Sequence, residues 1–135
     1  MANTRYSYDL RGNLVKQEES SISTQYSYDA LGRLTTLTRG DERYSYQYDA
    51  FNRRISKRYE QKNSDWQTQW CHNYLYMGQK EIGTVDGSGR IFELRILGNG
   101  KGAEIGSAIA LELDGHMYVP IHDQSGHVAM LVDQT

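Results

Sequence analysis

The sequence predicts an all-β fold made of consecutive antiparallel β-hairpins that form a curved sheet. A tyrosine–aspartate unit recurs in it, beginning at Tyr6, Tyr26 and Tyr46, which is a step of 20 residues each time. Glycine and aspartate punctuate the strand-like stretches, as hairpin turns require. A helical reading is open only for residues 103–113, and Gly106 within that stretch argues against it.

The repeated unit has a strand, a turn and a return. Two tyrosines separated by one residue project from one face of a strand. The aspartate that follows accepts hydrogen bonds from backbone N–H groups of the turn, and glycine or asparagine three residues later tolerates the left-handed region. The three copies consist of Tyr6, Tyr8, Asp9 and Gly12, then Tyr26, Tyr28, Asp29 and Gly32, then Tyr46, Tyr48, Asp49 and Asn52.

The return strands are predicted at residues 14–16, 34–36 and 54–56. A hairpin of this size is marginal alone in water, so the hairpins must stack edge to edge. Stacking would bury a continuous tyrosine face. Because a turn aspartate recurs in every copy, whereas a catalytic pair has no reason to, we interpret these carboxylates as structural.

Beyond residue 57 the hairpins become longer and less regular. Residues 57–69 are expected to complete a long hairpin or form a loop, and Tyr74 and Tyr76 restore the Tyr-x-Tyr pattern. Further strands are expected at residues 81–85, 90–97, 109–113, 117–121 and 128–132, with turns at 86–89, 114–115 and 123–126 and a glycine-rich loop at 98–106. We treat residues 1–135 as one repeat region, regular over 6–57 and irregular over 58–135.

The composition favours a thin sheet over a thick core. Hydrophobic residues make up 38% and the mean hydropathy is −0.74, so the 11 tyrosines must supply much of the buried area. The net charge of −2, with bases and acids interspersed, argues against nucleic-acid binding. Cys71 is the single cysteine, so an intrachain disulfide is excluded. We expect no membrane span and find no targeting signal at the N-terminus.

Three groups of residues suggest chemistry, and we interpret each as structural. His116, His122, Asp123 and His127 match no strong zinc spacing. Cys71 and His72 are adjacent on a strand, so they point to opposite faces. Residues 98–102 are glycine-rich but lack the Gly-Lys-Ser/Thr ending of a phosphate loop. No catalytic residue, cofactor or metal is therefore expected, and the chain is predicted not to be an enzyme.

The pattern Tyr-x-Tyr-Asp-x-x-Gly-Arg/Asn-Leu resembles the YD repeats of RHS proteins, teneurins and the C components of bacterial Tc toxins. Residues 118–128, with His122, Asp123 and Gly126, resemble a later segment of the same family. The resemblance implies a β-strip that spirals into a hollow shell, which in bacterial polymorphic toxins encloses a C-terminal toxin. It also implies a secreted or cell-surface parent protein.

The same resemblance leaves two functions open. The first is a section of shell wall, with the rest of the shell and a toxin cargo as partners. The second is a module that binds cell-surface glycan through an aromatic strip. The self-cleaving Asp-Pro core motif of the family is absent, because the single proline, Pro120, follows Val119. We therefore expect a fragment of a larger protein.

A section of β-strip has two open edges, and open edges pair with other chains. The isolated chain is therefore expected to self-associate. Its first strand, residues 5–9, and its last, residues 128–132, are the expected pairing edges.

Overall fold

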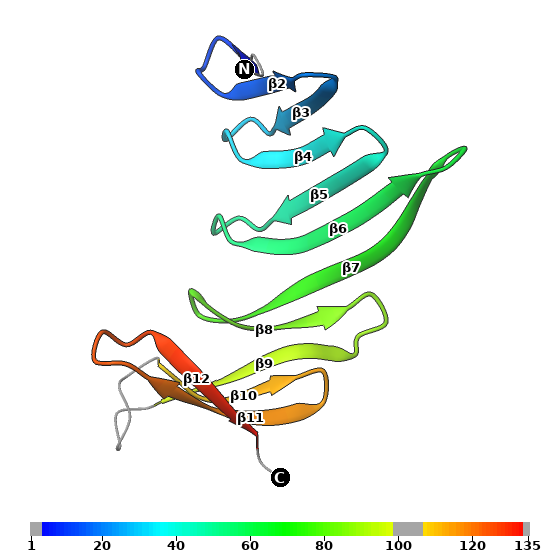
Figure 1. Cartoon of the computed structure of the whole chain (residues 1–135). Helices are drawn as coiled ribbons and strands as arrows, with labels where there is room; N and C mark the ends of the chain where they lie inside the picture. Colours follow the sequence, from blue (N-terminus) through cyan, green and yellow to red (C-terminus); the bar gives the residue numbers. More distant parts are fainter. Residues whose placement is uncertain (1–3, 99–106, 134–135) are drawn as a thin grey trace. The chain divides into compact units, whose positions relative to one another are not determined.

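The computed structural model describes residues 4–98 and 107–133 (Figure 1). Within these ranges all regular secondary structure is β-strand. The strands are β1 (Thr4–Tyr8), β2 (Leu14–Glu19), β3 (Ile22–Tyr28), β4 (Leu34–Arg39), β5 (Glu42–Tyr48), β6 (Arg54–Lys62), β7 (Trp66–Met77), β8 (Lys80–Asp86), β9 (Ile91–Leu97), β10 (Ala108–Leu113), β11 (His116–His122) and β12 (Val128–Asp133).

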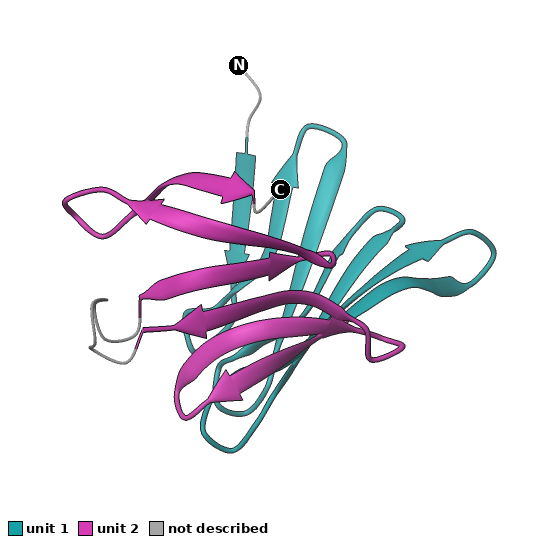
Figure 2. Ribbon diagram, turned by 90° about the horizontal axis from the view of Figure 1, so that it is seen from below, with its two compact units in different colours: residues 1–71 teal, residues 72–135 magenta. Residues whose placement is uncertain are grey.

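Each strand is hydrogen-bonded to the next one in the chain, in the order β1 to β12. The pairings are antiparallel, so the chain is a succession of hairpins, and the predicted all-β class is confirmed. The chain separates into two compact units, residues 1–71 and 72–135 (Figure 2). This division does not test whether residues 1–135 form one repeat region, so that statement stays a prediction.

The predicted strand positions agree with the structure to within one or two residues for β8 to β12. The alternative of a loop over residues 57–69 was wrong. Most of this stretch belongs to β6 and β7, joined by a short turn at residues 63–65, so the long-hairpin alternative is correct. The predicted loop at 98–106 lies outside the described residues apart from Gly98.

The strand register gives unit 1 two chemically different faces. One cross-strand row runs Tyr26, Leu37, Tyr44, Tyr59, and the three Tyr-x-Tyr pairs point to this same face, which we call the tyrosine face. The next row along the strands points the other way and is polar: Ser7, Lys16, Gln25, Thr38, Arg43 and Glu60. The period-two pattern of the sequence therefore gathers the tyrosines on one face and leaves the opposite row polar.

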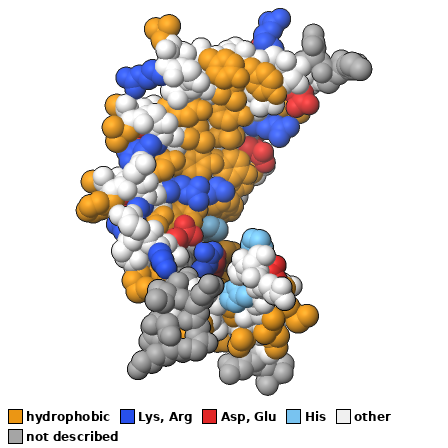
Figure 3. Space-filling view, turned by 90° about the vertical axis from the view of Figure 1, so that its left-hand side faces the viewer, with side chains coloured by type: hydrophobic (Ala, Val, Ile, Leu, Met, Phe, Trp, Pro, Cys, Tyr) orange, Lys and Arg blue, Asp and Glu red, His pale blue; other side chains and the backbone are white. Residues whose placement is uncertain are grey.

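No hydrophobic side chain in the described part of the chain is fully buried. The continuous tyrosine face was expected to be buried, but its side chains are only partly buried. The tyrosines of β3 and β5 are half-buried, while Tyr6 and Tyr8 are 51% and 61% exposed. The reason is that the strands of unit 1 form a single layer, so this unit supplies no second layer to cover the face. Figure 3 shows hydrophobic side chains forming a continuous band over unit 1, with charged side chains at its margins.

Candidate functional site

The turn at Asp29 is built by one carboxylate. Its Oδ1 accepts hydrogen bonds from the backbone N–H groups of Leu31 (2.9 Å) and Arg33 (3.0 Å), and its Oδ2 accepts from Nε of Arg33 (2.7 Å). The backbone N–H of Gly32 donates to the carbonyl of Asp29 at 3.0 Å. Gly32 has a φ of 78°, which glycine adopts without steric cost.

The same turn occurs five times in the described residues. It begins at Asp9, Asp29, Asp49, Asp86 and Asp123, and each time the aspartate N–H donates to the carbonyl four residues on. Each strand pair carries a register shift directly before its turn. The hairpins at Asp86 and Asp123 are therefore regular members of the series. Their spacing from aspartate to glycine is the same as at Asp29, and the turns predicted at residues 86–89 and 123–126 are present.

Hydrogen bonds to the turn carboxylates lower their pKa values. The pKa of Asp29 lies below its usual value, chiefly because the Arg33 backbone amide donates to the charged form. At Asp123 the backbone amide of His127 is the main cause of a lowered pKa, and at Asp86 it is the Ser88 hydroxyl. At Asp49 partial desolvation raises the pKa, but the hydrogen bonds from Arg53 outweigh it and leave the value lowered.

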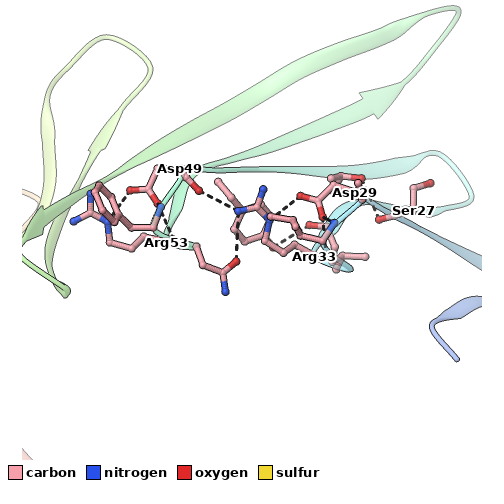
Figure 4. Close-up of polar contacts among 12 residues, drawn as sticks. Ser27, Asp29, Arg33, Asp49 and Arg53 are labelled. Carbon is pink, nitrogen blue, oxygen red and sulfur yellow. Dashed lines mark hydrogen bonds and ion pairs between the residues drawn. The ribbon is translucent and has the colours of Figure 1, made fainter. Parts of the chain in front are cut away.

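The repeat motif includes the residue four positions after each turn aspartate, but the contact that its side chain makes was not predicted from the sequence. This residue is Asn13, Arg33, Arg53, Arg90 or His127, and its side chain faces the aspartate Oδ2. Arg33 also reaches the next turn, donating from Nη1 to the carbonyl of Asp49 at 3.0 Å, and lies over the Tyr48 ring (Figure 4). Arg11 links the first turn to the second through the Ala30 carbonyl.

The second tyrosine of the repeat locks neighbouring hairpins together. The Tyr28 hydroxyl donates to the carbonyl of Leu14 at 2.9 Å, and the Tyr48 hydroxyl donates to the carbonyl of Leu34 at 2.9 Å. Leu14 and Leu34 are the first residues of β2 and β4. Each lock therefore ties a tyrosine strand to the return strand before it, and it repeats with the same step as the sequence.

An aromatic cluster occupies the tyrosine face at β5 to β7. The ring centroids of Tyr44 and Tyr59 are 5.0 Å apart, and Trp70 lies 5.6 Å from Tyr59 and 6.3 Å from Tyr44. The Lys57 ammonium lies 5.2 Å from the Tyr44 centroid. Such pairs add about 0.5–1.5 kcal/mol each beyond their buried area. A trough of about 300 Å³ lies beside this cluster and includes Tyr26 and Tyr44 in its lining.

The polar face contains one nearly buried ion pair. Arg43 donates from Nε and Nη2 to the two carboxylate oxygens of Glu60 at 2.8 and 2.9 Å, and Glu60 is only 7% exposed. The hydrogen bonds from Arg43 lower the pKa of Glu60, and the guanidinium also lies 4.4 Å from the centre of Trp66. A bidentate pair of this kind fixes the register of β5 against β6.

The remaining predicted residues are dispersed over unit 2. Tyr74 and Tyr76 lie in the second half of β7, and His122 ends β11 directly before the Asp123 turn, in which Gly126 has a φ of 81°. Over residues 4–98 and 107–133 no group of three or more His, Cys, Asp or Glu side chains is placed to hold a metal ion. None of these residues forms a helix able to cross a membrane.

Cys71 and His72 have different surroundings. The Cys71 sulfur lies 3.5 Å from the Ser56 hydroxyl, whereas the His72 ring stacks on Phe92 with centroids 4.9 Å apart. Apart from Gly98, the glycine-rich stretch weighed as a phosphate loop falls outside the described residues.

Comparison with known proteins identifies the family of one segment of the chain. No curated protein matches the chain. The family model described as RHS Repeat matches residues 8–44, which contain the first two aspartate turns and the lock between them. RHS repeats are structural repeats and do not form a catalytic family. This match assigns the segment to the RHS/YD-repeat family.

Proposed function

We propose that the chain is a section of the wall of an RHS-type β-shell, which encloses or presents a C-terminal toxin and has no catalytic activity of its own. The single observation that carries this proposal is the lock that each tyrosine strand makes to the preceding return strand. A lock repeated at a fixed step lets a wall grow by adding identical hairpins. In this proposal the parent protein acts at the cell surface or outside the cell.

The two faces of unit 1 support a wall function. A wall separates two environments, and here one face carries tyrosine and leucine while the other carries serine, threonine, glutamine and paired charges. The turn aspartates are engaged in hydrogen bonds within their own turns, so they support structure in place of proton transfer. A catalytic site needs several free titratable groups that converge on one point, and these contacts do not support such a site.

The test is to determine the coding sequence that follows the codon for Thr135 in the source genome. An Asp-Pro core motif followed by an unrelated domain would support the proposal. That longer protein would then be treated with protease, and the unrelated domain should be protected while the shell is intact. A stop codon directly after Thr135, or a downstream domain cleaved as fast as an unfolded control, would overturn it.

Glycan binding is the second candidate, and the aromatic cluster favours it. Tyrosine and tryptophan rings stack on the apolar faces of sugars. The trough beside the cluster also offers Arg39 and Glu42, which can hydrogen-bond sugar hydroxyls. This function needs no enclosed cargo, so it stands if the wall proposal fails.

A binding measurement separates the two candidates. The chain would be titrated with a panel of cell-surface oligosaccharides, and the titration repeated for Tyr44→Ala and for Tyr6→Ala as a matched exposed tyrosine. Saturable binding that is lost in Tyr44→Ala, with the far-ultraviolet circular dichroism unchanged, would support glycan recognition. Absence of saturable binding in the folded parent chain would exclude it for that panel.

A further inference from the structure

We infer that copies of this chain associate head to tail, with β12 of one copy pairing with β1 of the next. The pairing would repeat between two chains the step that joins β2 to β3 and β4 to β5 within one chain. This inference concerns assembly of the 135-residue chain and does not depend on the proposed enclosure of a toxin.

β12 is equivalent to β2 and β4 in its position after a turn aspartate. β2 begins five residues after Asp9, β4 five residues after Asp29, and β12 five residues after Asp123, and each has six residues. The register shift lies at the same place in all three hairpins. β2 and β4 each pair on their far side with a tyrosine strand. In the described part of the chain, β12 pairs only with β11.

β1 is a tyrosine strand that, over the described residues, pairs only with β2. The hydroxyls of Tyr28 and Tyr48 donate to Leu14 and Leu34, and both side chains are half-buried. Tyr8, at the equivalent position, is 61% exposed. The carbonyl equivalent to those of Leu14 and Leu34 belongs to Val128. Repeating the step therefore brings the Tyr8 hydroxyl of one copy to the Val128 carbonyl of another.

The register of the new pair follows from the same equivalence. Lys16 faces Gln25 and Thr36 faces Ser45, which pairs the residue seven positions after one aspartate with that four positions before the next. Across the copies, Met130 would face Arg5. Every side chain of β12 is exposed, and five of its six residues are apolar. Such an edge is a template for strand addition.

The two edges carry opposite charges. The single charged residue of β1 is Arg5, and that of β12 is Asp133. Pairing of like edges joins strands of the same charge, whereas head-to-tail pairing joins strands of opposite charge. Because the two surfaces differ, successive copies can add without limit unless a ring closes.

The test uses three double variants of the whole chain. Tyr6→Lys with Tyr8→Lys blocks the β1 edge, and Val128→Lys with Leu131→Lys blocks the β12 edge. Leu10→Lys with Leu31→Lys is the matched control, since it adds the same charge at turn positions that are 108% and 76% exposed. Circular dichroism verifies that each variant is folded, and sedimentation velocity at rising concentration gives its size.

The parent chain and the control should grow in size with concentration, and each edge-blocked variant alone should be monomeric. An equimolar mixture of the two edge-blocked variants should form a heterodimer and nothing larger, because each supplies the edge that the other lacks. A monomeric parent chain would overturn the inference. Self-association of either edge-blocked variant alone would overturn it as well, since that requires pairing of like edges or another surface.

A single-atom variant tests the hydroxyl contact. Tyr8→Phe should weaken association roughly two- to tenfold, which corresponds to one neutral hydrogen bond. Tyr28→Phe loses the equivalent bond within one chain, so it should lower stability and leave association unchanged. Equal association constants for Tyr8→Phe and the parent chain would exclude the inferred register.

Discussion

At the scale of single residues, the turn aspartate organises the hairpin turn through its hydrogen bonds. Oδ1 of Asp29 accepts two backbone hydrogen bonds and Oδ2 accepts a charged one from Arg33. Asparagine could keep the first two bonds, whereas alanine would lose all three. We therefore expect Asp29→Ala to lower the urea midpoint clearly more than Asp29→Asn, because the backbone N–H groups of Leu31 and Arg33 would lose their acceptor. Equal midpoints for the two variants would show that the carboxylate does not organise the turn.

The tyrosine hydroxyl makes a second prediction at this scale. Tyr28→Phe and Tyr48→Phe should each lower the free energy of unfolding by about 0.5–1.5 kcal/mol, the usual contribution of one neutral hydrogen bond. Tyr8→Phe is the control at protein concentrations where the chain is monomeric, because the exposed Tyr8 side chain has no such partner within one copy over the described residues. Chemical denaturation of the three variants measures the difference. A loss for Tyr8→Phe as large as for Tyr28→Phe would contradict the lock.

The third prediction at this scale concerns the ion pair between Arg43 and Glu60. Removing the charge of Glu60 by Glu60→Gln leaves a half-buried guanidinium without its bidentate partner, and we expect a loss of about 1–3 kcal/mol. Glu18→Gln breaks the exposed pair with Lys16 and should have little measurable effect. Unfolding curves of both variants at low and moderate salt check this contrast. Equal effects would mean that burial of Glu60 contributes nothing.

At the scale of elements, local turn chemistry explains how much the sequence predicts. The hairpins at Asp9, Asp29 and Asp49 are readable because each turn is specified within five residues. The Arg43–Glu60 pair joins residues 17 apart, and the link from Arg33 to Asp49 joins residues 16 apart. Such contacts depend on strand register, which only a consistent alignment of several strands fixes. Exposure of the tyrosine face depends on the absence of a second layer, which no single segment records.

Gly83 in β8 was also beyond sequence reasoning, because its role is close approach and not turn formation. A Cβ there would clash with the Glu93 carbonyl oxygen of β9. Gly83→Ala should therefore force β8 and β9 apart and destabilise the chain more than Gly12→Ala, whose cost is only the backbone strain at a φ of 86°, about 1–2 kcal/mol. Thermal unfolding of both variants gives the order. A smaller loss for Gly83→Ala would mean that the strands relax freely.

At the scale of the whole molecule, the five turn aspartates link stability to pH. Their carboxyl groups have pKa values below the usual range in the folded chain, because hydrogen bonds favour the charged form. A group whose folded pKa is lowered contributes stability above its unfolded value, about 3.9, and loses it as the pH falls through the folded value. The stability of the chain should thus be level above about pH 5 and fall steeply below about pH 4.

The matched variant carries Asn at Asp29, Asp49 and Asp123. Asparagine does not titrate in this range, so the variant should be less stable at neutral pH but lose less stability between about pH 5 and pH 3. Urea midpoints measured across this range give the two slopes. Because the same carboxylate closes every described hairpin of this type, the slope should decrease with each replacement, and single, double and triple variants should form a graded series. Identical slopes for the parent chain and the triple variant would place the acid sensitivity elsewhere, with Glu60 as the next carboxylate to test, since Arg43 lowers its pKa as well.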